Sequence, residues 1–233
     1  MDATSLLLLF DIDGTLVTGA AEAHAQAMHE ALHTVHGVDA RRLRIPIAPA
    51  GRTDPEIARA LLLSAGVSAA QIDDRADEVR EQCCRAYVRL CPPDLRGTVL
   101  PGIPQLLAWL AQREDVVLGL LTGNYEPVAR LKLRRAGLGG SFSPGQGAFG
   151  SDSEDRTMLP AIARRRAGQV GAPHPRGHTI VIGDTPRDIA CARADEVRCL
   201  AVATGPYPAD ALGDADAVVG DAGELRGVLE EML

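Results

Sequence analysis

Lysine is almost absent from this chain of 233 residues, since Lys132 is the only one and, with histidine counted as neutral, all other positive side chains are arginines. Positive charge is also in the minority, because 24 lysines and arginines face 31 aspartates and glutamates, which gives a formal net charge of −7 at pH 7. An acidic chain of this kind lacks the basic surface with which proteins bind nucleic acid. We therefore expect no nucleic-acid partner.

The sequence also lacks a cysteine framework and a long apolar run. Its five cysteines are odd in number and include no CxxC pair, which argues against disulfides or a zinc site and indicates reduced thiols. No apolar stretch is long enough to span a membrane, and residues 6–10 are too few for the core of a signal peptide. We expect a cytoplasmic protein without a membrane partner.

The most informative stretch is residues 6–16, LLLLFDIDGTL, where an apolar run ends in two aspartates. The run is too short for a helix and precedes a turn signal, so it predicts a buried strand of a parallel sheet. Asp11 and Asp13 are two residues apart and can face one ligand. A solvated turn is the alternative, because Asp and Gly are common in turns. Two converging acids, however, need a cation or a proton between them.

Strand and helix patterns alternate from residue 97 onward, which is typical of a parallel sheet covered by helices. The expected fold class is α/β, a Rossmann-like doubly wound parallel sheet (residues 1–18 and 97–233) with an inserted all-helical domain (residues 19–96). The length allows one domain and such an insertion. We expect strands near 6–10, 116–122, 146–150, 178–183, 197–204 and 217–219, and helices near 21–36, 54–65, 69–90, 104–112, 125–136, 157–167, 186–194 and 222–232.

Two later strands also end in polar residues. Residues 116–121 run into Thr122, Gly123 and Asn124, and residues 179–182 run into the sequence GDTPRD. Ligands of open parallel sheets bind beyond the carboxyl ends of the strands, so we expect these groups to meet the first aspartates there. Thr122 could equally be the N-cap of the helix that follows.

Taken in order, the three strand ends resemble the motif set of the haloacid dehalogenase-like hydrolases, and the closest group in character is that of the phosphoglycolate phosphatases. The core matches over nearly the whole chain. The matching residues are Asp11, Asp13, Gly14 and Thr15 for the DxDGT motif, Thr122 for the second motif, and Asp184 and Asp188 for the acidic fourth motif.

The resemblance implies a Mg²⁺ site, since Mg²⁺ takes hard oxygen ligands. Asp11 and Asp184 are the expected carboxylate ligands, and Asp13 is expected to contribute its backbone carbonyl. Asp188 lies one helical turn beyond Asp184. We therefore expect it to act through water or by supporting the other ligands.

The same resemblance implies a phosphatase that works through an aspartyl-phosphate. Asp11 is the expected nucleophile, and Asp13 would protonate the leaving oxygen and then activate water. Thr122 and the N–H groups of Gly123 and Asn124 would donate to the transferring phosphoryl group.

The third motif departs from the family pattern. These enzymes usually place a lysine, and sometimes an arginine, between the second and fourth motifs to bind phosphate, and no lysine stands in residues 149–160, where this motif is expected. We assign this role to Arg156, whose fork can bind phosphate. A surface arginine paired with Asp155 is the alternative reading of Arg156, and Lys132 is the alternative cation.

The helical insertion resembles the mobile cap of this superfamily, which closes over the site and favours a small phosphate ester. Arg52, in the loop GRTD, could hold an anionic group of the substrate, or it could be a surface arginine near Asp54.

Competing functions remain a phosphomutase, a haloacid dehalogenase, or a non-catalytic binding module on the same fold. Dehalogenation has no use for an acid at Asp13. Phosphonate hydrolysis through a Schiff base needs a lysine in the cap, which this sequence lacks. The pattern indicates no particular oligomeric state.

Overall fold

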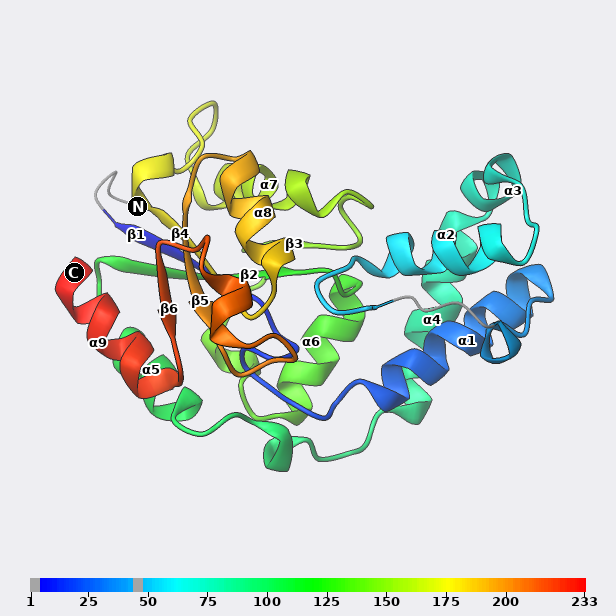
Figure 1. Cartoon of the computed structure of the whole chain (residues 1–233), viewed down its shortest axis with the longest axis horizontal. Helices are drawn as coiled ribbons and strands as arrows, with labels where there is room; N and C mark the ends of the chain where they lie inside the picture. The colour runs from blue at the N-terminus through cyan, green and yellow to red at the C-terminus, as the bar shows by residue number, and fades with distance from the viewer. Residues whose placement is uncertain (1–4, 44–47) are drawn as a thin grey trace.

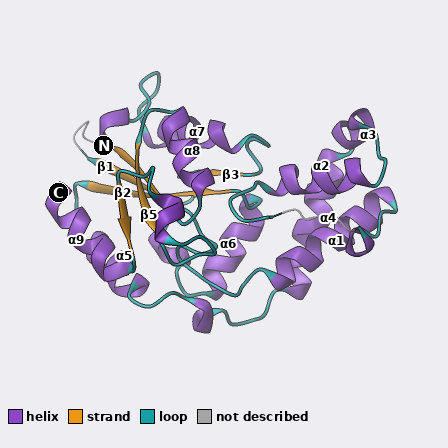
Figure 2. Ribbon diagram, in the orientation of Figure 1, coloured by secondary structure: helices purple, strands orange, loops and turns teal. Residues whose placement is uncertain are grey.

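The computed structural model describes residues 5–43 and 48–233 and separates a sheet-containing region from a lobe of helices (Figure 1). Figure 2 shows that the strands lie together on one side of the molecule and that the other side is helical. The strands are β1 (Leu6–Phe10), β2 (Val116–Thr122), β3 (Ala148–Phe149), β4 (Thr179–Gly183), β5 (Arg198–Val202) and β6 (Ala217–Val219).

Every pairing in the sheet is parallel, in the order β3-β2-β1-β4-β5-β6. The predicted α/β class is therefore confirmed. The order changes direction where β1 separates β2 from β4, and this is the point at which doubly wound sheets bind ligands. The carboxyl ends of β1, β2 and β4 are thus neighbours.

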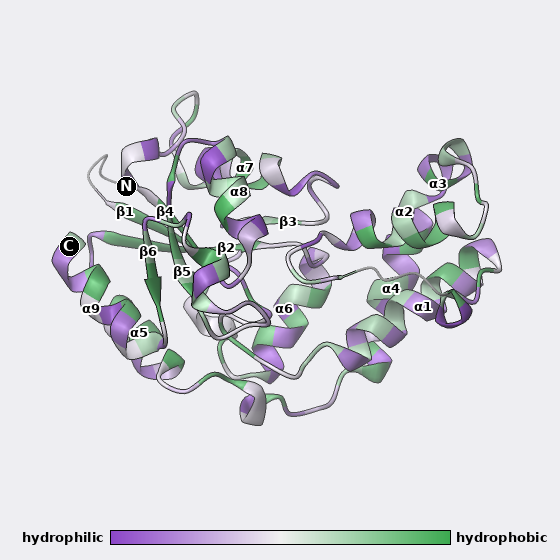
Figure 3. Cartoon of the chain, viewed as in Figure 1, coloured by the Kyte–Doolittle hydropathy of each residue, from purple (hydrophilic) through white to green (hydrophobic). Residues whose placement is uncertain are grey.

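The uninterrupted apolar run of β1 follows from burial on both faces. Leu6, Leu8 and Phe10 belong to one hydrophobic cluster, and Leu7 and Leu9 belong to the other. Alternate side chains of a strand point to opposite faces, so a strand covered on both sides must be apolar throughout. Figure 3 shows the contrast between the mostly apolar strands and the banded helices.

Helices cover both faces of the sheet. Helices α5, α6 and α9 contribute buried residues to the cluster of Leu8, whereas α7 and α8 contribute to the cluster of Leu9. A proline lies in the first turn of four of them, where its missing N–H costs nothing. Their bounds are α5 (Ile103–Leu110), α6 (Glu126–Arg135), α7 (Leu159–Ala167), α8 (Pro186–Ala194) and α9 (Ala222–Met232).

The helical lobe comprises α1 (Glu22–His36), α2 (Asp54–Ser64), α3 (Ala69–Asp74) and α4 (Ala76–Leu90) (Figure 1). Within residues 19–43 and 48–96 there is no strand. The single helix expected over 69–90 was wrong, because the backbone at Arg75 leaves the helical region and divides it. The Arg75 side chain donates to the carbonyl of Val35 and pairs with Glu78, so tertiary contacts stabilise this break. In the described part of the chain, no helix combines the length and apolarity needed to cross a membrane.

Candidate active site

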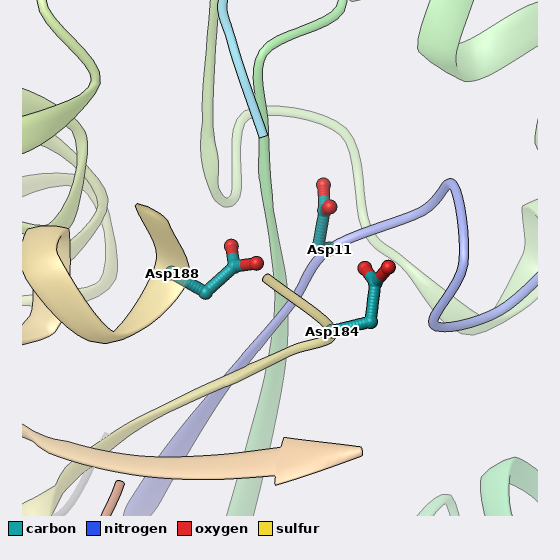
Figure 4. A group of neighbouring side chains, drawn as sticks. All are labelled: Asp11, Asp184 and Asp188. Atoms are coloured by element: carbon teal, nitrogen blue, oxygen red, sulfur yellow. The ribbon is translucent and has the colours of Figure 1, made fainter. Parts of the chain in front are cut away.

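Three buried carboxylates meet at the carboxyl edge of the sheet (Figure 4). Asp11 directly follows β1, Asp184 directly follows β4, and Asp188 lies in the first turn of α8. One oxygen of each lies within 4.8 Å of those of the other two. The structure thus brings together the three side chains that the sequence placed near one metal ion.

Asp184 has an oxygen that is free to bind a cation. Its Oδ1 accepts a hydrogen bond from Thr15 Oγ1 at 3.2 Å, whereas its Oδ2 is buried without a hydrogen-bond partner among the described residues. Glycines flank this oxygen, since a Cβ on Gly14 or Gly205 would lie only 2.1 or 1.7 Å from it. A buried acceptor without a partner costs free energy, so this oxygen suits a metal ligand.

The three carboxylates destabilise one another's charged forms. Burial is the main cause that raises the pKa of Asp184 to about 8, and the charges of Asp11 and Asp188 add to it. Burial also raises the pKa of Asp11 to about 7, against the opposing charge of Arg156. A divalent cation would favour the ionised forms.

Asp188 makes hydrogen bonds to Arg156 and to Thr185 through its two carboxylate oxygens. Its Oδ1 lies 2.5 Å from Arg156 Nη2, and its Oδ2 accepts hydrogen bonds from the N–H and Oγ1 of Thr185 at 3.0 and 2.6 Å. Both oxygens are therefore engaged within the protein, and the second pair of bonds closes the capping box at the start of α8. Asp188 therefore contacts Arg156 and the start of α8, and its supporting role beside a metal ion stays a prediction.

Arg156 points into the site from the short helix η4 (Arg156–Met158). Only 6% of the side chain is exposed, and Nη2 lies 3.4 Å from Asp11 Oδ1. The alternative of a surface pair with Asp155 is wrong, because Asp155 instead accepts from the N–H and Oγ1 of Thr157. Three buried acids and one arginine leave a formal charge of −2, which matches a divalent cation such as Mg²⁺.

Asp13 faces a different cation. Its two oxygens lie 2.8 and 2.6 Å from Lys132 Nζ, and Asn124 Nδ2 donates to Oδ2 at 3.0 Å. Burial raises the pKa of Asp13, but the charge of Lys132 and the hydrogen bonds from Lys132 and Asn124 outweigh burial and lower the pKa below its ordinary value. The two candidate cations of the sequence analysis therefore occupy separate places.

Thr122 closes this polar group at the end of β2. Its Oγ1 accepts from Asn124 Nδ2 at 2.8 Å. Helix α6 begins at Glu126 with Tyr125 at its N-cap, so the alternative role of Thr122 as that N-cap was wrong. The strand-end pattern predicted a role only for the backbone N–H of Asn124, and its side chain has these additional contacts.

The loop before α2 crosses the edge of the site. Gly123 accepts a hydrogen bond from the N–H of Asp54 at 2.8 Å, and a Cβ on Gly123 would lie 2.0 Å from the carbonyl oxygen of Arg52. Thr53 Oγ1 donates to the carbonyl of Glu154 at 2.6 Å. The backbone of the helical lobe therefore packs directly on the second strand end.

The side chain of Arg52 has protein partners in this arrangement. It pairs with Glu56, and its Nε donates to the carbonyl of Ala48 at 3.1 Å. The expected alternative partner, Asp54, is instead buried and accepts from the N–H of Tyr125 at 2.7 Å, with His24 Nε2 at 3.0 Å. The pair of His24 and Asp54 was not predicted, because neither an isolated histidine nor an aspartate at the start of a helix indicates its partner in the sequence.

Comparison with known proteins agrees with the fold and motifs. The family model of the haloacid dehalogenase-like hydrolases matches residues 8–193, and no curated protein matches the chain. Among solved structures, a hydrolase from Pseudomonas syringae is 24% identical with a TM-score of 0.64, over 97% of this chain and 98% of that one.

Two further solved structures are similar in fold. A β-phosphoglucomutase from Clostridium difficile is 18% identical with a TM-score of 0.71, over 97% of this chain and 96% of the other. A Haemophilus somnus protein described as a predicted phosphoglycolate phosphatase is 17% identical with a TM-score of 0.63, over 98% of this chain and 99% of the other. The family match covers most of the sequence, and the chain belongs to the haloacid dehalogenase-like hydrolases.

Proposed function

We propose that this hydrolase is a Mg²⁺-dependent phosphatase that cleaves a small phosphomonoester through an aspartyl-phosphate. The observation that carries the proposal is the unpartnered, buried Oδ2 of Asp184 beside Asp11, within a group whose formal charge is −2. When bound there, Mg²⁺ supplies positive charge that lets an anionic phosphate approach an anionic nucleophile. Asp11 and Asp184 would hold it with the backbone carbonyl of Asp13.

Asp11 and Asp13 have different roles in the two half-reactions. In the first, an oxygen of Asp11 bonds to phosphorus, the ester P–O bond breaks, and the leaving oxygen takes a proton from the protonated form of Asp13, which the lowered pKa makes a stronger acid. In the second, water attacks phosphorus and gives a proton to Asp13, and the bond between phosphorus and Asp11 breaks to release phosphate. Arg156, Thr122 and the N–H groups of Gly123 and Asn124 would stabilise the phosphoryl oxygens.

The proposal predicts phosphomonoesterase activity that depends on Mg²⁺. Purified protein should release inorganic phosphate from p-nitrophenyl phosphate with Mg²⁺ present, lose this activity after chelation with EDTA, and regain it when Mg²⁺ is restored. Halide release from a haloacid, or conversion of a sugar phosphate to its isomer without phosphate release, would instead identify a dehalogenase or a mutase. Activity that is equal with EDTA and with Mg²⁺ would contradict the metal assignment.

We propose further that the helical lobe is a cap over the site and that Arg52 binds a second anionic group of the substrate. The loop of residues 51–54 lies against Gly123, next to the expected phosphoryl site. Binding would require Arg52 to exchange Glu56 for the substrate anion. Residues 19–96 would then form the cap domain, and residues 1–18 and 97–233 the catalytic core.

Arg52→Ala should raise KM about 10- to 100-fold for a carboxylated ester such as phosphoglycolate, because it removes a charge-assisted hydrogen bond. KM for p-nitrophenyl phosphate, which lacks the second anion, should change little. Arg85→Ala is a matched control in the same lobe, since Arg85 is paired only with Glu81 in the described structure and is exposed. Equal losses on both substrates would show that Arg52 is not a specificity group.

A further inference from the structure

The only lysine of the chain is buried behind Asp13. The Lys132 side chain is 0% exposed, whereas 38% of the Asp13 side chain is exposed. A substrate that reaches Asp13 therefore meets the carboxylate and not the ammonium group behind it. Because burying a charge is costly unless it is paired, the contacts of this lysine identify what it does.

The ammonium group of Lys132 has no donor left for a phosphate. Lysine carries three N–H donors, and Nζ has three acceptors within 3.0 Å, namely Oδ1 and Oδ2 of Asp13 and Oδ1 of Asn124. The phosphate-binding role of the third motif needs free donors that face the nucleophile. Arg156 has the contact with Asp11, at 3.4 Å.

We propose that Lys132 is a positioning residue that fixes the carboxylate of Asp13 for proton transfer to and from the substrate, and that it is not the phosphate-binding cation. This inference rests on the proposed phosphatase function. In it, Lys132 acts only through Asp13 and Asn124 and does not contact the substrate.

The Asn124 amide completes this arrangement. Its Oδ1 accepts from Lys132, so its Nδ2 is directed toward Asp13 Oδ2, at 3.0 Å, and Thr122 Oγ1, at 2.8 Å. Lys132 therefore sets the orientation of Asp13 twice, once directly and once through the amide. Both oxygens of Asp13 have fixed donors, and rotation of the carboxylate would break several hydrogen bonds at once.

The residue type also fits this role. An ammonium group is a compact charge with donors in three directions, whereas the guanidinium of arginine is a planar fork. Three acceptors from two side chains converge on Nζ, which suits the former. The single lysine of the chain therefore stands where one atom donates to three acceptors.

The test uses leaving groups of different basicity. An alkyl phosphate such as phosphoglycolate needs a proton from Asp13 as its P–O bond breaks, whereas p-nitrophenolate leaves with little help. Lys132→Met should lower kcat on the alkyl phosphate on the order of 100-fold with KM near the wild-type value. The loss on p-nitrophenyl phosphate should be clearly smaller. A variant that is merely less folded would lose activity equally on both substrates.

Two further variants distinguish the loss of Asp13 positioning from a nonspecific loss of activity. Arg134→Met removes a cation from an exposed position of the same helix and should match wild type on both substrates. In an Asp13→Asn background, adding Lys132→Met should cost almost nothing more on either substrate, because the group that it positions is already gone. Additive losses in this double-mutant cycle would overturn the proposal.

Asn124→Ala covers the case in which Lys132→Met does not fold. It keeps the backbone N–H and removes the amide that donates to Asp13 and Thr122 and accepts from Lys132, while the direct pair of Lys132 with Asp13 remains. It should therefore show a smaller loss that again falls mainly on the alkyl phosphate. Equal losses on both substrates would overturn the proposal in either variant, as would a Lys132→Met enzyme that behaves like Arg134→Met. These outcomes require an active wild type, so they differ from the absence of any phosphatase activity, which would contradict the proposed function itself.

Discussion

Asp11→Asn should give a folded protein that turns over phosphate esters on the order of 10⁴-fold more slowly than wild type, or not measurably. The amide has the shape of the carboxylate but cannot attack phosphorus, so the aspartyl-phosphate cannot form. Steady-state kinetics with saturating Mg²⁺ measure this loss. More than a trace of Mg²⁺-dependent activity in the folded variant would contradict the assignment of Asp11 as nucleophile.

The stability of this variant should not fall, and the reason lies in the charges around it. Burial and the neighbouring acids disfavour the charged form of Asp11, whose pKa is raised to about 7. A neutral amide removes that repulsion from Asp184 and Asp188. The free energy of unfolding at neutral pH without metal should therefore equal or exceed that of wild type. Asp210→Asn, at an exposed position of the short helix Ala209–Leu212, is the matched control and should change neither quantity.

Arg156→Ala should lower kcat on the order of 100-fold, as expected when a positioned donor to the transition state is lost. It should also destabilise the fold, by about 3–5 kcal/mol as for a broken buried ion pair, because Asp188 and Asp11 lose their cation. Urea unfolding without metal and steady-state kinetics with Mg²⁺ measure the two effects separately.

Arg156→Lys separates charge from geometry at this position. A lysine keeps the positive charge and loses the fork, so it should retain more activity and stability than alanine. If Arg156→Ala is near wild type while Lys132→Ala is inactive on every substrate, the phosphate-binding role belongs to Lys132.

The sheet was predictable because its signal is local and strong. A strand buried on both faces must be apolar, so the uninterrupted apolar run of residues 6–10 predicts such a strand. Because Asp11 directly follows this strand, it is expected at the carboxyl edge of the sheet. The change from apolar to polar residues at the ends of β2 and β4 identified Thr122 and Asp184 as candidate site residues in the same way. These predictions needed only the rule that parallel strands end at one edge.

The details that were missed depend on contacts between distant segments. No glycine or proline near Arg75 predicts the break between α3 and α4. The break is instead stabilised by a hydrogen bond from Arg75 to the carbonyl of Val35 on another helix. Arg52 was expected to face Asp54 or a substrate, but it pairs from the loop before α2 with Glu56, in the first turn of that helix. Lys132 did leave a signal, since its spacing from Val128 and Ala129 places it on the buried face of α6.

The burial of Lys132 has a consequence for the surface chemistry of this protein. With its one side-chain amine inside, the positive side-chain charge outside is carried by guanidinium groups, which keep their proton far into the alkaline range, and by histidines. Reagents directed at amines therefore find no lysine on the folded surface. Acylation or methylation of Lys132 in the native enzyme would require α6 to separate transiently from the strand ends. The rate of this modification would therefore measure how often the site opens.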